Sequence, residues 1–224
     1  MSRLTKVTST AVTILGLCAA GVSAGDQTGA AMTKAAVATT TPATVTAEPG
    51  QKAPEFSLKD TEGKTHSLGQ YLQSGKIVVV HWFNANCPFI VRHYEKYTTF
   101  TDLDKAYGGK GVVFLAVNST NPKHPQFGGD AEMAKKWGIH YPILLDPNGD
   151  IGKLYSAKTT PHVFIITKDG VIRYNGAIDD DSQDAKESKD KVNFVKKALD
   201  ELLAGKPVTV AESKPYGCGV KYAQ

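Results

Sequence analysis

The stretch from Ile77 to Ile90 constrains the fold more than any other part of this 224-residue chain. Residues 77–83 form an apolar, β-branched run, which is typical of a strand buried on both faces. After a polar turn, Cys87 and Pro88 open a segment with helical spacing, and proline is favoured in the first turn of a helix. The pattern predicts a central strand that delivers one cysteine to a helix N-terminus.

Cys87 is therefore the candidate redox nucleophile. The first turn of a helix carries unpaired N–H groups and the positive end of the helix dipole, and both favour a thiolate over a thiol. The alternative is that Cys87 is a small buried core residue, as free cysteines usually are. The succession of strand, polar turn, Cys-Pro and helix favours the redox role.

The first 24 residues have the pattern of a secretory signal peptide. Two basic residues precede an apolar run over residues 12–20, and small residues end at Ala24, where cleavage is expected. We therefore expect an exported, periplasmic mature protein. Lipoprotein anchoring through Cys18 ranks second, because Leu17 stands before it where such sites need a small residue.

The rest of the chain divides into three segments. Residues 25–50 are rich in Ala, Thr and Pro and are predicted to be a disordered linker. Residues 51–205 form one domain, and residues 206–224 form a C-terminal tail. After export, Cys87 remains in the domain and Cys218 in the tail. The two cysteines could form a structural disulfide, or they could take part in a redox reaction. A domain of this size does not need a disulfide in order to fold, which favours a redox role for the two cysteines.

Apolar periodicity predicts an α/β domain with crossover helices. A β-hairpin is expected from residues 53–58 and 65–68, followed by strands at 77–83, 112–117, 142–145, 162–167 and 171–174. Helices are expected from Cys87 to residue 107, before Gly138, up to Tyr155, and over about 190–204. This order implies a parallel portion of sheet that an antiparallel hairpin completes.

Several short motifs, in this order, resemble the thioredoxin superfamily. The closer resemblance is to its redoxin branch, the alkyl hydroperoxide reductase and thiol-specific antioxidant family, with a peroxiredoxin-like subgroup. The matching segments are Ala53–Leu58, Trp82–Glu95, Thr160–Ile166, Lys168–Ile172, Gly176–Asp180 and Gly217–Lys221. The resemblance spans about residues 51–224 and implies a thioredoxin-like three-layer fold, with a central mixed β-sheet flanked by helices and an N-terminal β-hairpin.

The same resemblance implies roles for four residues. Cys87 is the nucleophile, and Pro161 is the cis-proline that faces it. Thr160 presents its backbone to a bound substrate. Cys218 corresponds to the resolving cysteine that two-cysteine peroxiredoxins keep near the C-terminus, on a tail where mobility is expected. A static disulfide or an unrelated free thiol are the alternatives for Cys218.

Polar residues near Cys87 are further candidates. Asn84 could donate a hydrogen bond to the thiolate, or it could simply be a turn residue. His162 follows Pro161 and could approach the sulfur, or it could be structural. Arg92 and His93 are expected at the solvated surface, because helical spacing turns them away from the helix start.

Three departures from the family pattern limit the reactions that Cys87 is expected to carry out. Thioredoxins carry a second cysteine three residues after the first, and Ile90 stands there, which excludes local dithiol exchange. Close members of the subgroup often have a cysteine three residues before, where this chain has Asn84. Peroxidases of the family have Pro and Thr upstream, where this chain has Val80 and Asn84. Peroxide chemistry is weakened by this departure, but it is not excluded.

The leading hypothesis is a thiol-based oxidoreductase with antioxidant, peroxiredoxin-like activity, which draws electrons from a protein thiol or a small thiol. The alternative is a periplasmic thiol-disulfide oxidoreductase acting on protein disulfides. Lower alternatives are a metal-handling protein using Cys87 with His162 or His81, and a non-enzymatic thioredoxin-like binding module. No cofactor and no nucleic-acid partner are predicted, because phosphate-binding glycine motifs, a complete zinc signature and a basic stripe are missing from the sequence. The sequence makes no prediction of oligomeric state.

Overall fold

The computed structural model describes residues 47–223. The predicted signal peptide at 1–24, with Cys18, and the predicted linker up to residue 46 lie outside the described residues. The domain makes contacts before its predicted start at residue 51, since Ala47 is buried and the Gly50 N–H donates to Ile172 O at 2.8 Å. No helix within residues 47–223 has the length and apolar character needed to cross a bilayer.

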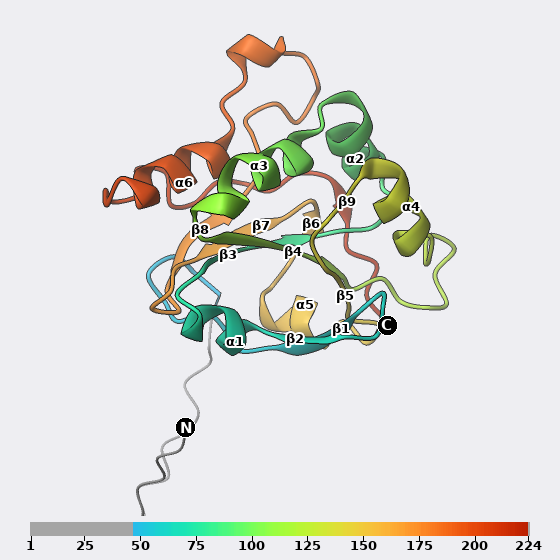
Figure 1. The fold of residues 1–224 in the computed structure, drawn as a ribbon. Coiled ribbons are helices and arrows are strands. Elements are labelled where there is room, and N and C mark those ends of the chain that lie inside the picture. The colour runs from blue at the N-terminus through green and yellow to red at the C-terminus, as the bar shows by residue number, and fades with distance from the viewer. Residues whose placement is uncertain (1–46, 224) are drawn as a thin grey trace, which may run out of the picture. The chain divides into compact units, whose positions relative to one another are not determined.

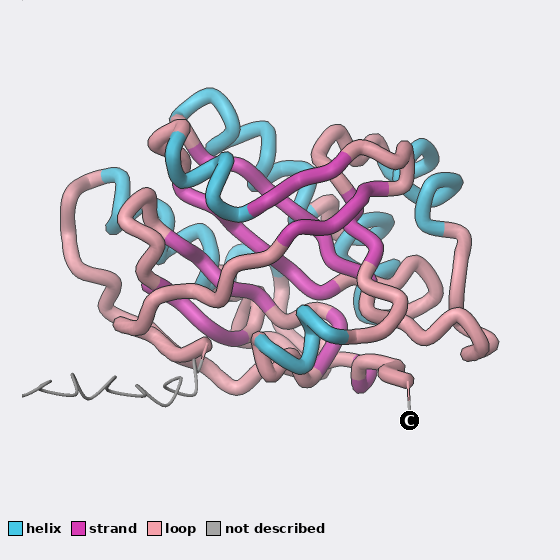
Figure 2. Tube along the Cα trace, turned by 90° about the horizontal axis from the view of Figure 1, so that it is seen from below, coloured by secondary structure: helices cyan, strands magenta, loops and turns pink. Residues whose placement is uncertain are grey.

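A seven-stranded mixed β-sheet forms the centre of the domain, in the order β2-β1-β5-β4-β3-β7-β8 (Figures 1 and 2). Its strands are β1 (Ser57–Asp60), β2 (Thr65–Ser67), β3 (Ile77–Trp82), β4 (Val112–Asn118), β5 (Ile143–Leu145), β7 (Val163–Ile166) and β8 (Ile172–Gly176). Strands β3, β4 and β5 run parallel, whereas β7 and β8 add an antiparallel hairpin beside β3. The predicted N-terminal hairpin, β1–β2, extends the sheet because β1 pairs with β5.

Helices cover both faces of this sheet, as predicted (Figure 1). One face carries α2 (Pro88–Val91), α3 (Thr99–Tyr107), α4 (Asp130–Trp137) and α6 (Phe194–Leu203), and the other carries α1 (Leu68–Gln73) and α5 (Asp150–Leu154). Successive strand residues point to opposite faces, so Val79 and Val80 of β3 enter two separate apolar cores. The central strands are buried on both sides, which explains their continuous apolar sequence.

The helix predicted from Cys87 to residue 107 is divided into three parts. Helix α2 passes into one turn of π-helix at Arg92–Lys96, and the chain then breaks at Thr98, which has a left-handed φ of 49°. The Thr98 hydroxyl donates to Asp102 at 2.6 Å, inside α3. The apolar residues keep near-helical spacing across the break, so the sequence pattern predicts one helix. The C-terminal helix is also shorter than predicted, because Asn193 caps it by accepting the Lys196 N–H.

Candidate active site

Cys87 lies where β3 ends and α2 begins. It is the N-cap residue of α2, its N–H donates to Asn84 O at 3.0 Å, and Pro88 is the first helical residue. The side chain is nevertheless almost fully buried, with 1% of its surface exposed, and belongs to the apolar core under α2 and α3. Cys87 thus combines the helix-start position of a reactive thiol with the burial of a core residue.

The backbone of Thr160 faces this thiol. The Thr160–Pro161 peptide bond is cis, and the Cys87 Sγ donates a hydrogen bond to Thr160 O at 3.1 Å. The two residues reach each other because β7 pairs with β3, which places the start of β7 beside the end of β3. The structure therefore brings together Cys87, Thr160 and Pro161 as the sequence predicts.

Cys218 lies at the same point. It belongs to β9 (Cys218–Gly219), which pairs antiparallel with β6 (Thr159–Thr160) and sets Cys218 opposite Thr160. Cys218 is half-buried, and both cysteines are free thiols. Burial raises the pKa of the Cys218 thiol to about 11, and its interaction with the Cys87 thiol adds to the shift. Two cysteines that are distant in the sequence thus lie beside the same residue, Thr160.

The C-terminal tail is docked along the domain rather than projecting from it. Ser213 accepts the Ala177 N–H at 2.9 Å, and the Tyr222 hydroxyl donates to Ala157 O at 2.8 Å. Between these anchors, Gly217 has a φ of +135° and passes under the Thr160 carbonyl, where a Cβ would clash. The tail, which the sequence predicts to be mobile, is held on both sides of Cys218 by backbone pairing and side-chain packing.

The Gly217→Ala variant is expected to loosen the tail and expose Cys87. A methyl group would collide with Thr160 O in a backbone conformation that alanine rarely adopts, which costs ~1 kcal/mol or more of docking. Alkylation of Cys87 in the reduced protein, followed by peptide mass mapping, should accelerate about tenfold.

Gly219→Ala is the matched control, because a Cβ there meets no atom within 4 Å. It should leave the alkylation rate unchanged. An unchanged rate in Gly217→Ala as well would show that the tail does not limit access to Cys87.

Comparison with known proteins places these residues in a family. A protein-family model described as Redoxin matches residues 48–192, more than half of the chain. The chain belongs to the Redoxin family. The family and the thioredoxin-like α/β fold predicted from the sequence are thereby confirmed. The matched segment of this Redoxin contains Cys87, Thr160 and Pro161, whereas Cys218 lies beyond it.

Similar proteins carry two kinds of name. A "Thiol-disulfide oxidoreductase ResA" from Geobacillus thermodenitrificans is 30% identical over 55% of this Redoxin and 66% of the relative, so slightly under two thirds of that protein is matched. A Mycobacterium tuberculosis protein named "Putative peroxiredoxin" is 26% identical over 60% of this chain and 80% of its own. The crystal structure of an uncharacterized conserved protein from Geobacillus kaustophilus has a TM-score of 0.68 and 29% identity, covering 78% of this chain and 92% of its own.

Two predicted site residues of this Redoxin do not contact the Cys87 sulfur. Asn84 donates to Thr120 Oγ1 at 2.7 Å and accepts the Asn86 N–H at 2.7 Å, so it shapes the turn before Cys87. His162 interacts with Asn175 Oδ1 at 2.6 Å and accepts the Lys158 N–H at 3.1 Å, so both ring nitrogens are occupied. Its ring packs against Phe164, in the core on the opposite face of the sheet from Cys87. Alternation along the strand, which sequence proximity to Pro161 does not reveal, explains the error.

The structure also contradicts the surface position expected for His93. Its ring is buried, its Nε2 lies 3.0 Å from the Tyr216 hydroxyl, and burial lowers its pKa to about 4. Tyr216 in turn donates to Asp179 Oδ1 at 2.5 Å. Sequence reasoning missed this trio. The one available signal was the position of Tyr216, two residues before Cys218 and so on the same face of an extended tail.

The metal-handling alternative finds no ligand set in the described part of the chain. No group of three His, Cys, Asp or Glu side chains within residues 47–223 is arranged to hold a metal ion. His81 points into an aromatic cluster and stacks on Phe100 at 4.1 Å between ring centroids. His162 faces the other core. Neither histidine is hydrogen-bonded to the Cys87 thiol, whose partner is Thr160 O.

Proposed function

We propose that this Redoxin is a thiol-dependent oxidoreductase, with Cys87 as the nucleophile and Cys218 as its resolving partner. The observation that carries the proposal is the pairing of β6 with β9, which sets Cys218 opposite Thr160 while Thr160 O accepts the Cys87 thiol. A pair of free thiols held in contact is the reduced form of a reversible disulfide. The pairing thus supports a chemical role over a static staple or an unrelated thiol.

The proposed reaction with a hydroperoxide has two steps. The Cys87 thiolate attacks the terminal peroxide oxygen, the O–O bond breaks, and the alcohol leaves after taking up a proton, which makes Cys87 a sulfenic acid. The Cys218 sulfur then attacks the Cys87 sulfur, the S–O bond breaks, and water leaves as the disulfide forms. An external thiol supplies the two electrons and two protons that restore both thiols. The chain's own part is to hold Cys218 within reach.

Access favours a small oxidant. Cys87 is 1% exposed. An extended protein segment would bind the backbone of Thr160 along the edge of β6, but β9 already pairs with that edge. A hydroperoxide needs only a local opening of the tail, whereas a protein disulfide needs β9 to leave β6. The peroxiredoxin-like activity is therefore the first proposal.

The second candidate is thiol-disulfide exchange with exported proteins. It is favoured by the names of the ResA relatives, which are thiol-disulfide oxidoreductases. The same cysteine pair serves this reaction, with a protein disulfide in place of the peroxide. Both candidate functions include export to the periplasm, which the signal-like residues 1–24 predict.

The deciding experiment uses the expected mature chain, residues 25–224. The reduced protein is mixed with hydrogen peroxide, peroxide consumption is followed, and the product is mapped by mass spectrometry without reduction. Rapid consumption with a Cys87–Cys218 disulfide supports the peroxidase proposal. Consumption no faster than that of an ordinary thiol, together with reduction of a protein disulfide such as insulin, supports exchange instead. If no Cys87–Cys218 disulfide forms with either oxidant, the proposed pair is wrong.

A further inference from the structure

Tyr216 connects the tail to two buried polar residues of the domain. Its hydroxyl donates to Asp179 Oδ1 at 2.5 Å and lies 3.0 Å from His93 Nε2. His93 and Asp179 are both buried, with 1% and 5% of their surfaces exposed. The redox steps proposed above use none of these three groups.

The hydrogen-bond directions in this trio follow from the acceptors. Because the Tyr216 hydroxyl donates its proton to the Asp179 carboxylate, its oxygen can only accept from His93. The His93 Nε2 therefore carries a proton, and Nδ1 accepts from the Thr99 hydroxyl at 3.1 Å. Burial lowers the pKa of His93 to about 4, so this neutral tautomer persists at neutral pH. One hydrogen-bonded relay then runs from the Thr99 hydroxyl through His93 and Tyr216 to Asp179 Oδ1.

The aromatic ring of Tyr216 is also packed against the domain. It packs against Phe89 of α2, with ring centroids 5.9 Å apart, and the Arg92 guanidinium lies 5.5 Å from its centroid. Phe89 and Arg92 belong to the helical segment that starts at Cys87. The ring thus ties the tail to the same helix that positions the nucleophile.

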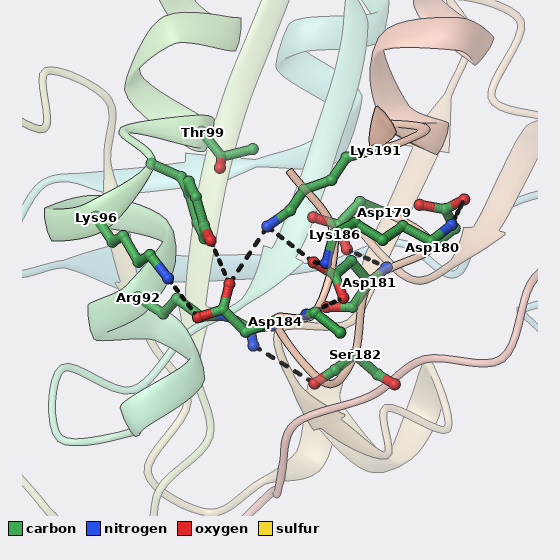
Figure 3. A network of polar contacts seen from close by, with 12 residues as sticks. Arg92, Lys96, Thr99, Asp179, Asp180, Asp181, Ser182, Asp184, Lys186 and Lys191 are labelled. Atoms are coloured by element: carbon green, nitrogen blue, oxygen red, sulfur yellow. Dashed lines mark hydrogen bonds and ion pairs between the residues drawn. The ribbon is translucent and has the colours of Figure 1, made fainter. Parts of the chain in front are cut away.

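Asp179 is held in place by the loop that follows it. Arg92 donates to the carbonyls of Asp181 and Ser182, and Lys96 pairs with Asp184 at 2.7 Å (Figure 3). The hydrogen bonds from Lys96 and Tyr97 hold the pKa of Asp184 well below its usual range. The loop at residues 179–184 is therefore packed against the π-helical turn, and this packing fixes the acceptor of Tyr216.

We propose that Tyr216 is a positioning residue that holds Cys218 against Cys87 through its hydrogen bonds to His93 and Asp179. This inference rests on the proposed function of the cysteine pair. Tyr216 precedes Cys218 by two residues, so anchoring its side chain fixes the strand that carries the second thiol. The anchor raises the effective concentration of Cys218 at Cys87 and so favours closure of the disulfide.

The test is Tyr216→Phe, which removes the hydroxyl and keeps the ring against Phe89 and Arg92. Two quantities are measured in the full mature protein: the reduction potential of the Cys87–Cys218 disulfide against glutathione, and the fraction of Cys87 that dimedone traps as sulfenic acid after one equivalent of peroxide. We expect the closure equilibrium to fall about tenfold, which is about 30 mV toward a more oxidising potential. The trapped fraction should rise, because closure competes less well with dimedone.

Tyr222→Phe is the matched control, since it removes another anchoring hydroxyl of the tail, bonded to Ala157 O at 2.8 Å, at a site outside the trio. It should leave potential and trapping unchanged. Asp179→Asn, which keeps the shape but weakens the acceptor, should shift both quantities in the same direction as Tyr216→Phe by a smaller amount.

Unchanged potential and trapping in both Tyr216→Phe and Asp179→Asn would overturn the positioning role while leaving the cysteine pair intact. Equal effects in Tyr216→Phe and Tyr222→Phe would also overturn it, because the loss of any tail contact would then weaken disulfide closure to the same extent. Failure of the wild-type protein to form the disulfide would instead contradict the proposed function itself, and the inference would fall with it.

Discussion

The Cys87→Ser variant is expected to consume hydrogen peroxide at least about a thousandfold more slowly than the wild-type protein, because removing the nucleophile removes the covalent pathway. Serine is close to cysteine in size and fits the buried position at the start of α2. The variant should therefore keep its fold while losing its chemistry. Stopped-flow measurement of peroxide loss at equal protein concentration checks this expectation.

Cys218→Ser is the matched variant, with a different expected result. It should consume the first equivalent of peroxide at close to the wild-type rate and then stop, because the sulfenic acid on Cys87 lacks a thiol partner. Intact-mass analysis after dimedone treatment should show one adduct per chain, on Cys87. Peroxide turnover that survives Cys87→Ser and is lost in Cys218→Ser would mean that the two cysteines have the opposite roles.

The free energy of unfolding is expected to fall steeply below about pH 6.5, because three histidines are buried in neutral form. Burial lowers the pKa of His81 to about 3 and the pKa values of His93 and His162 to about 4. In the unfolded chain these groups bind protons near pH 6.5. The unfolded state therefore takes up protons first, so this stability is complete above about pH 6.5 and is lost as pH falls toward the native values. Each group contributes up to about 1.4 kcal/mol per pH unit in that window.

His81→Phe isolates one of these contributions. The His81 ring is stacked on Phe100 and packed edge-on to Phe83 and Tyr141, a setting that suits a phenyl ring. The stability lost between pH 7 and pH 5, measured by urea unfolding, should be about 2 kcal/mol smaller in the variant than in the wild type. His140→Gln, at an exposed position, is the control and should keep the wild-type loss. An equal loss in His81→Phe would show that His81 does not titrate across unfolding.

The fold was accessible from the sequence because its signals are local. Neighbouring residues are enough to predict each of three features: a continuous apolar strand buried on both faces, an N-terminal hairpin with an alternating pattern, and a Cys-Pro at a helix start. Where local spacing stayed intact across a break, as at the π-turn before Thr98, the sequence predicted one helix, whereas the structure divides the segment into α2, a π-turn and α3. A π-turn is invisible to a pattern that merely counts apolar positions.

The candidate site was accessible in part, for the same reason. The sequence alone determined Cys87 at a helix start and Thr160–Pro161 at the beginning of a strand, since each is a local motif. Only the tertiary structure decided that the tail lies along β6, that His162 faces the opposite core, and that His93 and Asp179 meet at Tyr216. Those contacts depend on which strand edge is free and on which side of a sheet each residue points. Long-range packing in the folded chain determines both the free strand edge and the side of the sheet, and the neighbouring residues in the sequence do not encode either.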